Sequence, residues 1–536
     1  MKKNLILCLI LCISLFGYSQ NNNNSSFNYY QSSYGAQCLD KVHKCNIPAI
    51  IVKPSQGLNY NDKVTIIGVV SRTTIRDNNE YGTNIVNTLI LRVADENNKQ
   101  YDFEINKKVE SIFKIDPKNV SEIWDKWVLY KVLPMLQKNG FQVHERKEIE
   151  EDALEYLAKI ESSGLVLNDP CLLDYLYGLV AKIAPNKTLD DRPYSINITI
   201  VRNPDVNACM FPNGTLLINT GLLSSLHSED ELVAILSHEI AHYMLDHHIT
   251  NINEKANREK RAAFWASLTT AVAAVGDAYL ASQSKYYTFG GLTSVAALSS
   301  FAIASMVCER MGINYNQSQE SEADMVAKEV LQQMGYNKDA LATALSRIFD
   351  KMEIERSSAM YFSSATHPSI MSRIYGSGSV VELNQQDYEK RVSLAVTDCA
   401  IQLFQSKRYK QSMKLSTQNI NNGVGTADDY LTNAYCMLYT ANDKTSNDKV
   451  LKLIEKAKSI DSQNANIDKI EIIALLRDHQ DTQAISKLND YKKRLDDTYN
   501  SMKQIVSDDI WSSYYNFVLS EKDWANKMII KLNATK

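Results

Sequence analysis

The sequence predicts an α+β protein that is mainly helical. Short runs of alternating apolar and polar residues in the first fifth of the chain indicate a small β module. Most of the remainder has apolar residues at helical spacing. The 536 residues are 44% hydrophobic and 22% charged, enough for more than one domain, which excludes a wholly disordered polymer. The net charge of -4 offers no basic field for a polyanion, so we expect no nucleic-acid partner.

Residues 1–19 have the outline of a secretory signal peptide. Lys2 and Lys3 precede an apolar run from Leu5 to Phe16, and Gly17 begins a short stretch with small residues suited to cleavage. The apolar run is shorter than the ~20 residues that a membrane-spanning helix needs. We therefore expect an exported protein of the periplasm or cell envelope.

A linker is predicted over residues 20–60, because the stretch after the signal is rich in Asn, Ser and Tyr and lacks hydrophobic periodicity. Within it, Cys38 and Cys45 are close enough in sequence to close a small disulfide loop, with two unpaired thiols as the alternative. The small β module is predicted over residues 61–110, where three β-rich runs are separated by Asn, Asp and Gly.

The central domain is predicted over residues 147–385. Its first part is helical up to Ile183, and strands are expected at Tyr194–Val201 and Thr215–Asn219. A turn at residues 212–214 precedes the second strand. Ser228, followed three residues later by Glu231, is a capping-box pattern, so we expect a helix from there to about His247.

This helix carries the sequence His-Glu-x-x-His at His238, Glu239 and His242. Residues four apart on a helix lie on one face a turn apart, so the two imidazoles can bind the same metal ion. The carboxylate of Glu239 lies beside them, near where a bound water would sit. A surface helix with scattered histidines is the alternative, and the independent helix-start signal argues against it.

Two groups compete to be the third metal ligand. His248 is spaced six residues beyond His242, but it could reach the metal only if the chain left the helix between them, and position 245 is Leu rather than Gly. Downstream, Glu320 and Asp324 share one face of a helix predicted to end at Gly335. One of these carboxylates can bind the metal while the other accepts the ring N–H of a ligating histidine. Glu322 points away from that face, and His247 and His248 are interpreted as a pair at a helix C-terminus.

These residues resemble the zinc metallopeptidase family of the CAAX prenyl endopeptidase, HtpX and BepA, peptidase family M48. The resemblance covers roughly residues 154–374. It rests on four ordered motifs, which are Asn207-Ala208 through Thr220-Gly221-Leu222-Leu223, His238-Glu239-x-x-His242, Glu320-x-x-x-Asp324, and Thr366-His367-Pro368 followed by Arg373. It implies a zincin-type fold for the central domain.

The resemblance also implies the roles of the site residues. One zinc ion is expected, with His238, His242 and Glu320 as its ligands and no organic cofactor. Glu239 is expected to be the general base, and Asp324 to support a ligand. His367 and Arg373 are expected near the active site, where either is a candidate donor to the oxyanion of the tetrahedral intermediate. In one branch of the family the counterpart of His367 can approach the zinc and block the water position.

We expect from this an endopeptidase that acts on misfolded or misassembled envelope proteins. An extended substrate segment would add as a strand to the edge of the hairpin at residues 207–219. The alternative is a latent or inactive protease that acts as a chaperone or scaffold. The sequence specifies neither the physiological substrate nor the oligomeric state.

Two further regions are open to more than one interpretation. The apolar runs at residues 262–276 and 286–308 are predicted to be helices near the active site, with a membrane hairpin as the less favoured alternative because the second run is rich in Gly, Ser and Thr. Residues 386–536 are predicted to be helical, with amphipathic units spaced as in tetratricopeptide-like repeats. An ordinary helical cap is the equally weighted alternative.

Overall fold

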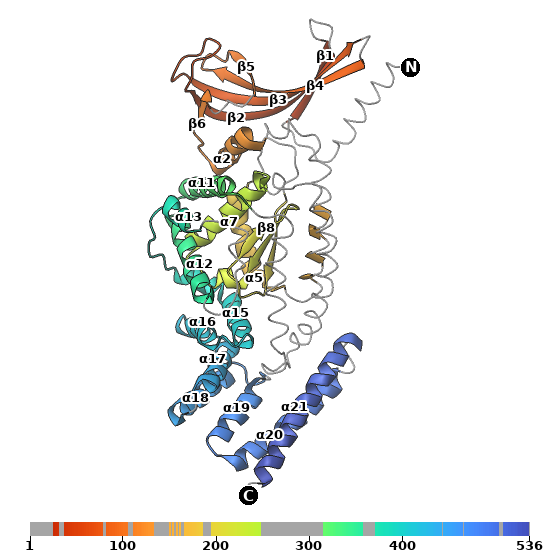
Figure 1. Ribbon diagram of the computed structural model, residues 1–536, viewed down its shortest axis with the longest axis vertical. Helices are drawn as coiled ribbons and strands as arrows, with labels where there is room; N and C mark the ends of the chain where they lie inside the picture. Colours follow the sequence, from red (N-terminus) through yellow and green to blue (C-terminus); the bar gives the residue numbers. More distant parts are fainter. Residues whose placement is uncertain are drawn as a thin grey trace. The chain divides into compact units, whose positions relative to one another are not determined.

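The computed structural model describes residues 25–31, 37–78, 82–105, 111–132, most of 150–161, 166–185, 195–247, 315–356, 370–441, 443–464, 466–502 and 508–534 (Figure 1). The chain divides into two compact units, Met1–Gly140 with Asn186–Arg192, and Phe141–Pro185 with Pro193–Lys536. The predicted signal peptide, both apolar runs, His248 and His367 lie outside the described residues. None of the helices in the described ranges combines the length and apolar character needed to cross a membrane.

The first unit is built on an antiparallel sheet with the strand order β1-β2-β3-β4-β5, and β6 pairs with β2. The strands are Ser25–Gln31 (β1), Gln37–Ile51 (β2), Lys63–Asn78 (β3), Gly82–Asp95 (β4), Gln100–Glu104 (β5) and Phe113–Ile115 (β6). A helix, Val120–Trp127 (α2), continues into the π-helical turn Val128–Val132 (η2). Trp124 on this helix is fully buried.

The linker predicted over residues 20–60 is wrong where β1 and β2 form. The side chains of Cys38 and Val42 are buried at even positions of β2, whereas Ile47 and Ile51 are buried at odd positions. A β-bulge between Lys44 and Ile47 shifts the register and reverses which parity faces the core. Because the alternation changes phase at this bulge, no single two-residue period runs through the strand, and the sequence pattern does not identify it.

The disulfide considered for Cys38 and Cys45 does not form. Both residues lie on β2, where seven residues of extended chain span about 23 Å. A disulfide requires Cα atoms within about 7 Å of each other. Instead, the Cys38 sulfur lies 3.8 Å from the hydroxyl of Thr74, and the Cys45 thiol donates to the carbonyl of Ile66.

The second unit contains a three-stranded sheet in the order β7-β9-β8. Asn197–Val201 (β7) runs parallel to Thr215–Asn219 (β9), and Ala208–Met210 (β8) pairs antiparallel with β9. The second predicted strand is confirmed, and the first begins three residues later than predicted. Gly214 in the turn has a φ of 85°, and a Cβ there would lie 2.0 Å from the carbonyl oxygen of Ser195, so only glycine fits.

Between residues 170 and 377, the described parts of this unit contain six helices. They are Pro170–Ile183 (α5), Thr220–Leu223 (α6), Glu229–Met244 (α7), Gln317–Met334 (α11), Ala340–Arg356 (α12) and Ile370–Ser377 (α13). Helix α7 contacts α5, α11, α12 and β8, and every residue from Glu231 to Met244 is buried. A helix buried on all sides belongs to the core, so the His-Glu-x-x-His sequence lies in the interior of this unit.

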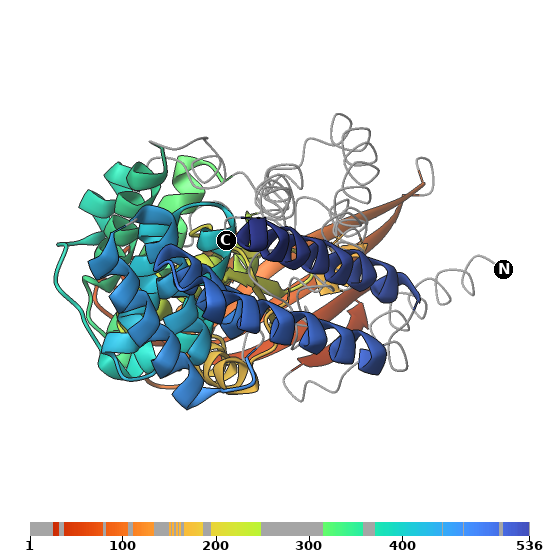
Figure 2. The ribbon, with the colours of Figure 1, turned by 90° about the horizontal axis from the view of Figure 1, so that it is seen from below.

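The C-terminal part is helical, as predicted. Its helices are Gln386–Arg391 (α14), Ser393–Gln405 (α15), Tyr409–Asn421 (α16), Ala427–Thr440 (α17), Lys444–Ile460 (α18), Asn466–Arg477 (α19), Asp481–Met502 (α20) and Asp508–Ala534 (α21). Successive helices from α15 to α21 pack on each other, and Figure 2 shows α20 and α21 side by side. Whether they are tetratricopeptide-like repeats stays a prediction. The Tyr388 hydroxyl donates to the carbonyl of Leu223, which joins this region to the sheet-bearing part of the unit.

Candidate metal centre

Helix α7 begins where the sequence predicts and ends earlier. The hydroxyl of Ser228 accepts from the Glu231 N–H at 3.2 Å. The Glu231 carboxylate accepts from the N–H of His227 rather than from Ser228, so only half of the predicted capping box forms. The helix ends at Met244, three residues before the predicted end, and Asp246 adopts the left-handed backbone conformation with a φ of 58°. Aspartate tolerates this conformation better than most residues.

The two imidazoles of α7 face each other. Nε2 of His238 and Nε2 of His242 lie 3.1 Å apart, and both side chains are buried. This arrangement follows from the four-residue spacing on one helix and confirms the geometry that the sequence predicts.

Helix α11 brings a carboxylate to these nitrogens from a distant part of the chain. The helix starts with a capping box between Asn316 and Gln319 and ends at Gly335, which has a φ of 79°. Glu320 in its first turn is buried, with Oε1 3.4 Å from Nε2 of His242 and Oε2 3.6 Å from Nε2 of His238. The donor atoms of His238, His242 and Glu320 all lie within 4.8 Å of one another.

The spacing of these donors fits a zinc ion. With bonds of about 2.0–2.1 Å, two ligands of a tetrahedral zinc are about 3.4 Å apart. The three closest separations here are 3.1, 3.4 and 3.6 Å. Two imidazoles and one carboxylate, with a fourth position left for water, form a ligand set typical of catalytic zinc.

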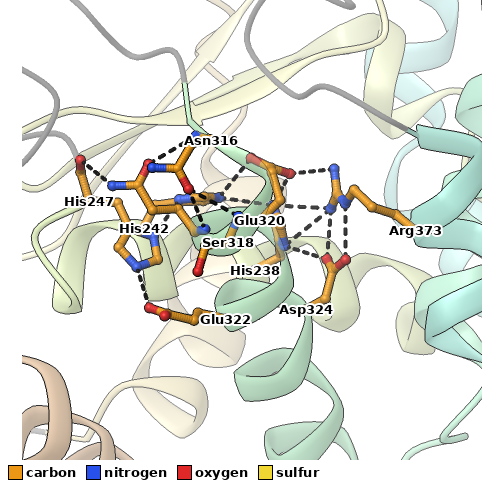
Figure 3. Close-up of polar contacts among 10 residues, drawn as sticks. His238, His242, His247, Asn316, Ser318, Glu320, Glu322, Asp324 and Arg373 are labelled. Carbon is orange, nitrogen blue, oxygen red and sulfur yellow. Dashed lines mark hydrogen bonds and ion pairs between the residues drawn. The ribbon is translucent and has the colours of Figure 1, made fainter.

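Asp324 and Arg373 surround His238 on the other side. Oδ1 of Asp324 lies 2.9 Å from Nδ1 of His238. Because a carboxylate only accepts, this contact places the imidazole proton on Nδ1 and leaves the lone pair of Nε2 pointing at the donor cluster. Arg373 on α13 contacts Asp324 at 2.7 and 3.0 Å, and its Nη1 lies 2.6 Å from Oε2 of Glu320 (Figure 3).

The electrostatics of these groups follow from burial and pairing. Burial alone would raise the pKa of Asp324, but hydrogen bonds from His238 and Arg373 outweigh it and hold that pKa below its usual value. Burial also lowers the pKa of His242 well below its usual value, despite the neighbouring Glu320 carboxylate, and this favours the neutral form of the imidazole. A neutral imidazole is the form that binds a metal.

The net formal charge of the buried groups around the ligands favours binding of a divalent cation. Glu239 is buried, and its charge contributes to raising the pKa of Arg373 although burial opposes the rise. The three carboxylates of Glu239, Glu320 and Asp324 together with the Arg373 guanidinium carry a net formal charge of -2. Buried charges need compensation, and a divalent cation would bring this group to neutrality.

Three residues near the ligands, His247, Glu322 and Tyr315, are not among the site residues that the sequence predicts. Nδ1 of His247 lies 2.9 Å from Nδ1 of His242, and Nε2 of His247 lies 3.4 Å from the carboxylate of Glu322. The ring of Tyr315 stacks on that of His242, with centroids 3.5 Å apart. His247 follows the C-terminal end of α7, as the sequence predicts, and its imidazole in addition contacts the ligand His242. Glu322 does point away from the donor cluster, as predicted.

Comparison with known proteins gives a consistent result. Residues 174–376 match the profile of Peptidase family M48. The chain is 26% identical over 197 residues to the Beta-barrel assembly-enhancing protease of Escherichia coli (strain K12), covering 37% of this chain and 36% of that protein. It is 27% identical over 198 residues to the Putative beta-barrel assembly-enhancing protease of Vibrio cholerae, covering 37% of each.

A similar match links the chain to a eukaryotic protein. It is 26% identical over 200 residues to the Mitochondrial metalloendopeptidase OMA1 of Schizosaccharomyces pombe, covering 37% of this chain and 50% of that protein. The matches thus span between about a third and a half of these relatives. The matched region includes α7, α11 and Arg373, and the chain therefore carries a domain of peptidase family M48.

Proposed function

We propose that this chain is a zinc-dependent endopeptidase of the cell envelope that hydrolyses peptide bonds in misfolded or misassembled proteins. The observation that carries the proposal is the convergence of His238, His242 and Glu320, from two helices far apart in sequence, in one buried cluster of possible metal ligands. The names of the bacterial relatives, which describe proteases that enhance β-barrel assembly, support an envelope role. The signal-like N-terminus supports export.

The zinc ion and the protein side chains would have separate roles in the reaction. Bound by His238, His242 and Glu320, zinc would lower the pKa of its water toward ~7 and polarise a peptide carbonyl. Glu239 accepts the proton of the attacking water and delivers it to the leaving amine nitrogen. Asp324 keeps the His238 proton on Nδ1, so that Nε2 remains a lone-pair donor.

Arg373 holds the two carboxylates in place. Its three nitrogens contact Asp324 and Glu320, so the guanidinium is committed to the groups around the metal. This favours a positioning role for Arg373 over donation to the oxyanion. The oxyanion role then falls to His367, as the other candidate that the sequence offers.

The substrate would bind as an added strand. In the described three-stranded sheet β8 pairs with β9 and stands at the end of the strand order, and we propose that an extended peptide adds at this end. Strand β8 contacts α7, which places this edge beside the helix that carries the ligands. Binding through the peptide backbone selects flexible or unfolded segments over particular side chains, which suits misassembled proteins as substrates.

The test compares Glu239→Gln with the unchanged chain in a casein digestion, with bound zinc measured in parallel. We expect the variant to keep one zinc per chain and to lose cleavage. The exposed Glu382→Gln is a control of the same chemical type and should cleave normally. Cleavage by Glu239→Gln at the normal rate would refute the assignment. A zinc-loaded chain that binds casein without cleaving it would favour the chaperone or scaffold alternative.

A further inference from the structure

The sequence Leu245-Asp246-His247 after α7 places a third imidazole behind one of the ligands. His247 is buried, and its Nδ1 lies 2.9 Å from Nδ1 of His242. On a continued helix, position 247 would be rotated about 140° from position 242 and could not make this contact. Asp246, directly before His247, has a left-handed backbone with a φ of 58°, so the regular helix does not continue to His247.

We propose that His247, held by Glu322 and Gln319, fixes the tautomer and ring orientation of His242 toward the metal. This deepens the proposed function and rests on its zinc site. Nε2 of His242 faces His238 and Glu320, so that nitrogen must present a lone pair. A neutral imidazole carries one N–H, which then has to be on Nδ1 of His242.

The proton on His242 determines the protonation of His247. Nδ1–H of His242 donates to Nδ1 of His247, which must be bare, so the single proton of a neutral His247 is on Nε2. That nitrogen faces the carboxylate of Glu322 at 3.4 Å, which only accepts (Figure 3). The tautomers of the two rings and the charge of Glu322 are thus mutually consistent. Since 3.4 Å exceeds the ~2.9 Å of a typical hydrogen bond, Glu322 acts mainly through its charge and has the smaller effect.

The backbone of His247 is anchored by the first turn of α11. Nε2 of Gln319 donates to the His247 carbonyl at 3.1 Å, while its Oε1 accepts from the N–H of Asn316 at 3.0 Å. Gln319 immediately precedes the ligand Glu320. The same helical turn therefore positions a metal ligand and the support of another ligand, which makes the two adjust together.

Tyr315 restricts the remaining freedom of the His242 ring. Its ring stacks on the imidazole with an interplanar angle of 13° and is itself buried. Stacking fixes the plane of the ring, and the contact with His247 fixes its rotation within that plane. His238 has a carboxylate as its orienting partner in Asp324, whereas His242 has an imidazole in His247.

The experiment measures zinc affinity of the full chain by competition with a chelator. His247→Phe keeps a ring but removes the acceptor, and we expect about 10- to 100-fold weaker zinc binding. His247→Asn places an amide oxygen near the Nδ1 position, so it should recover most of the affinity. Glu322→Gln should weaken binding only a few-fold. His227→Phe is the matched control, since His227 contacts Asn384 and Glu389 instead, and its zinc affinity should be unchanged.

A second readout separates positioning from a general loss of stability. The visible absorption of the cobalt-loaded chain reports the geometry of the ligands, and we expect it to change in His247→Phe and to be normal in His247→Asn. Equal zinc affinity and equal cobalt spectra in His247→Phe and the unchanged chain would overturn the inference while leaving the proposed function intact. An unchanged chain that binds no zinc would instead refute the proposed function itself. If His247→Phe does not fold, the other two variants decide. Unchanged zinc affinity in Glu322→Gln together with weakened zinc affinity in His247→Asn would overturn the inference about His247.

Discussion

Arg373→Met tests whether the guanidinium compensates the buried carboxylates. Arg373 is 8% exposed and makes contacts of 2.7 and 3.0 Å to Asp324 and 2.6 Å to Glu320. Methionine keeps much of the aliphatic volume and removes the charge. The formal charge of the four groups Glu239, Glu320, Asp324 and Arg373 changes from -2 to -3.

The size of the effect depends on the metal. Removing one partner of a buried ion pair costs about 3–5 kcal/mol in the free energy of unfolding, because the other charge is left uncompensated. That is the loss we expect for the metal-free protein. With zinc present, Glu320 has a new cationic partner and Asp324 alone loses compensation, so the loss should fall to about 2 kcal/mol.

Urea denaturation followed by circular dichroism, with EDTA or with zinc, measures both losses. Arg202→Met is the matched control, because Arg202 pairs with Asp398 rather than with a group at the metal centre. Its loss of stability should be the same under the two conditions. The reasoning would be refuted if Arg373→Met cost less than about 1 kcal/mol in EDTA, or if its cost did not depend on zinc.

Three further outcomes are expected. Asp324→Asn should bind zinc about 10- to 100-fold more weakly in chelator competition, because the His238 N–H loses a charged acceptor; equal affinity would contradict this. Dialysis against EDTA should abolish casein cleavage, and added zinc should restore it; activity that persists without metal would exclude the mechanism. Asp429→Ala should lower the free energy of unfolding by about 2–4 kcal/mol, because the buried carboxylate of Asp429 accepts from the hydroxyl of Thr397 and the backbone N–H of Thr426. Urea denaturation measures this loss. A loss below about 1 kcal/mol would show that these hydrogen bonds contribute little to stability.

Local signals account for most of what could be predicted about the metal centre. The Ser228 cap, the four-residue spacing of His238 and His242, and the glycine that ends α11 are each encoded within a few neighbouring residues. The approach of Glu320 to these histidines is not local. The helix face that Glu320 shares with Asp324 and the resemblance to the family predict this approach, and the geometry agrees with it.

The features that the sequence does not predict depend on backbone irregularities or on tertiary contacts. The contact of His247 with His242 lies beyond the end of α7, after Asp246 with its left-handed backbone, and helical periodicity does not extend to it. Strand β2 was missed because the bulge after Lys44 reverses its alternation. Tyr315 stacks on a residue more than seventy positions away, which no local pattern encodes.

The most direct test of the central claim is the amount of zinc bound to the purified chain, measured by elemental analysis after dialysis at a fixed free zinc concentration. We predict one zinc per chain, and a strong reduction in Glu320→Gln, since that variant replaces the only anionic donor of the cluster formed with His238 and His242. A chain without zinc, or a Glu320→Gln variant that binds zinc as tightly as the unchanged chain, would contradict the account.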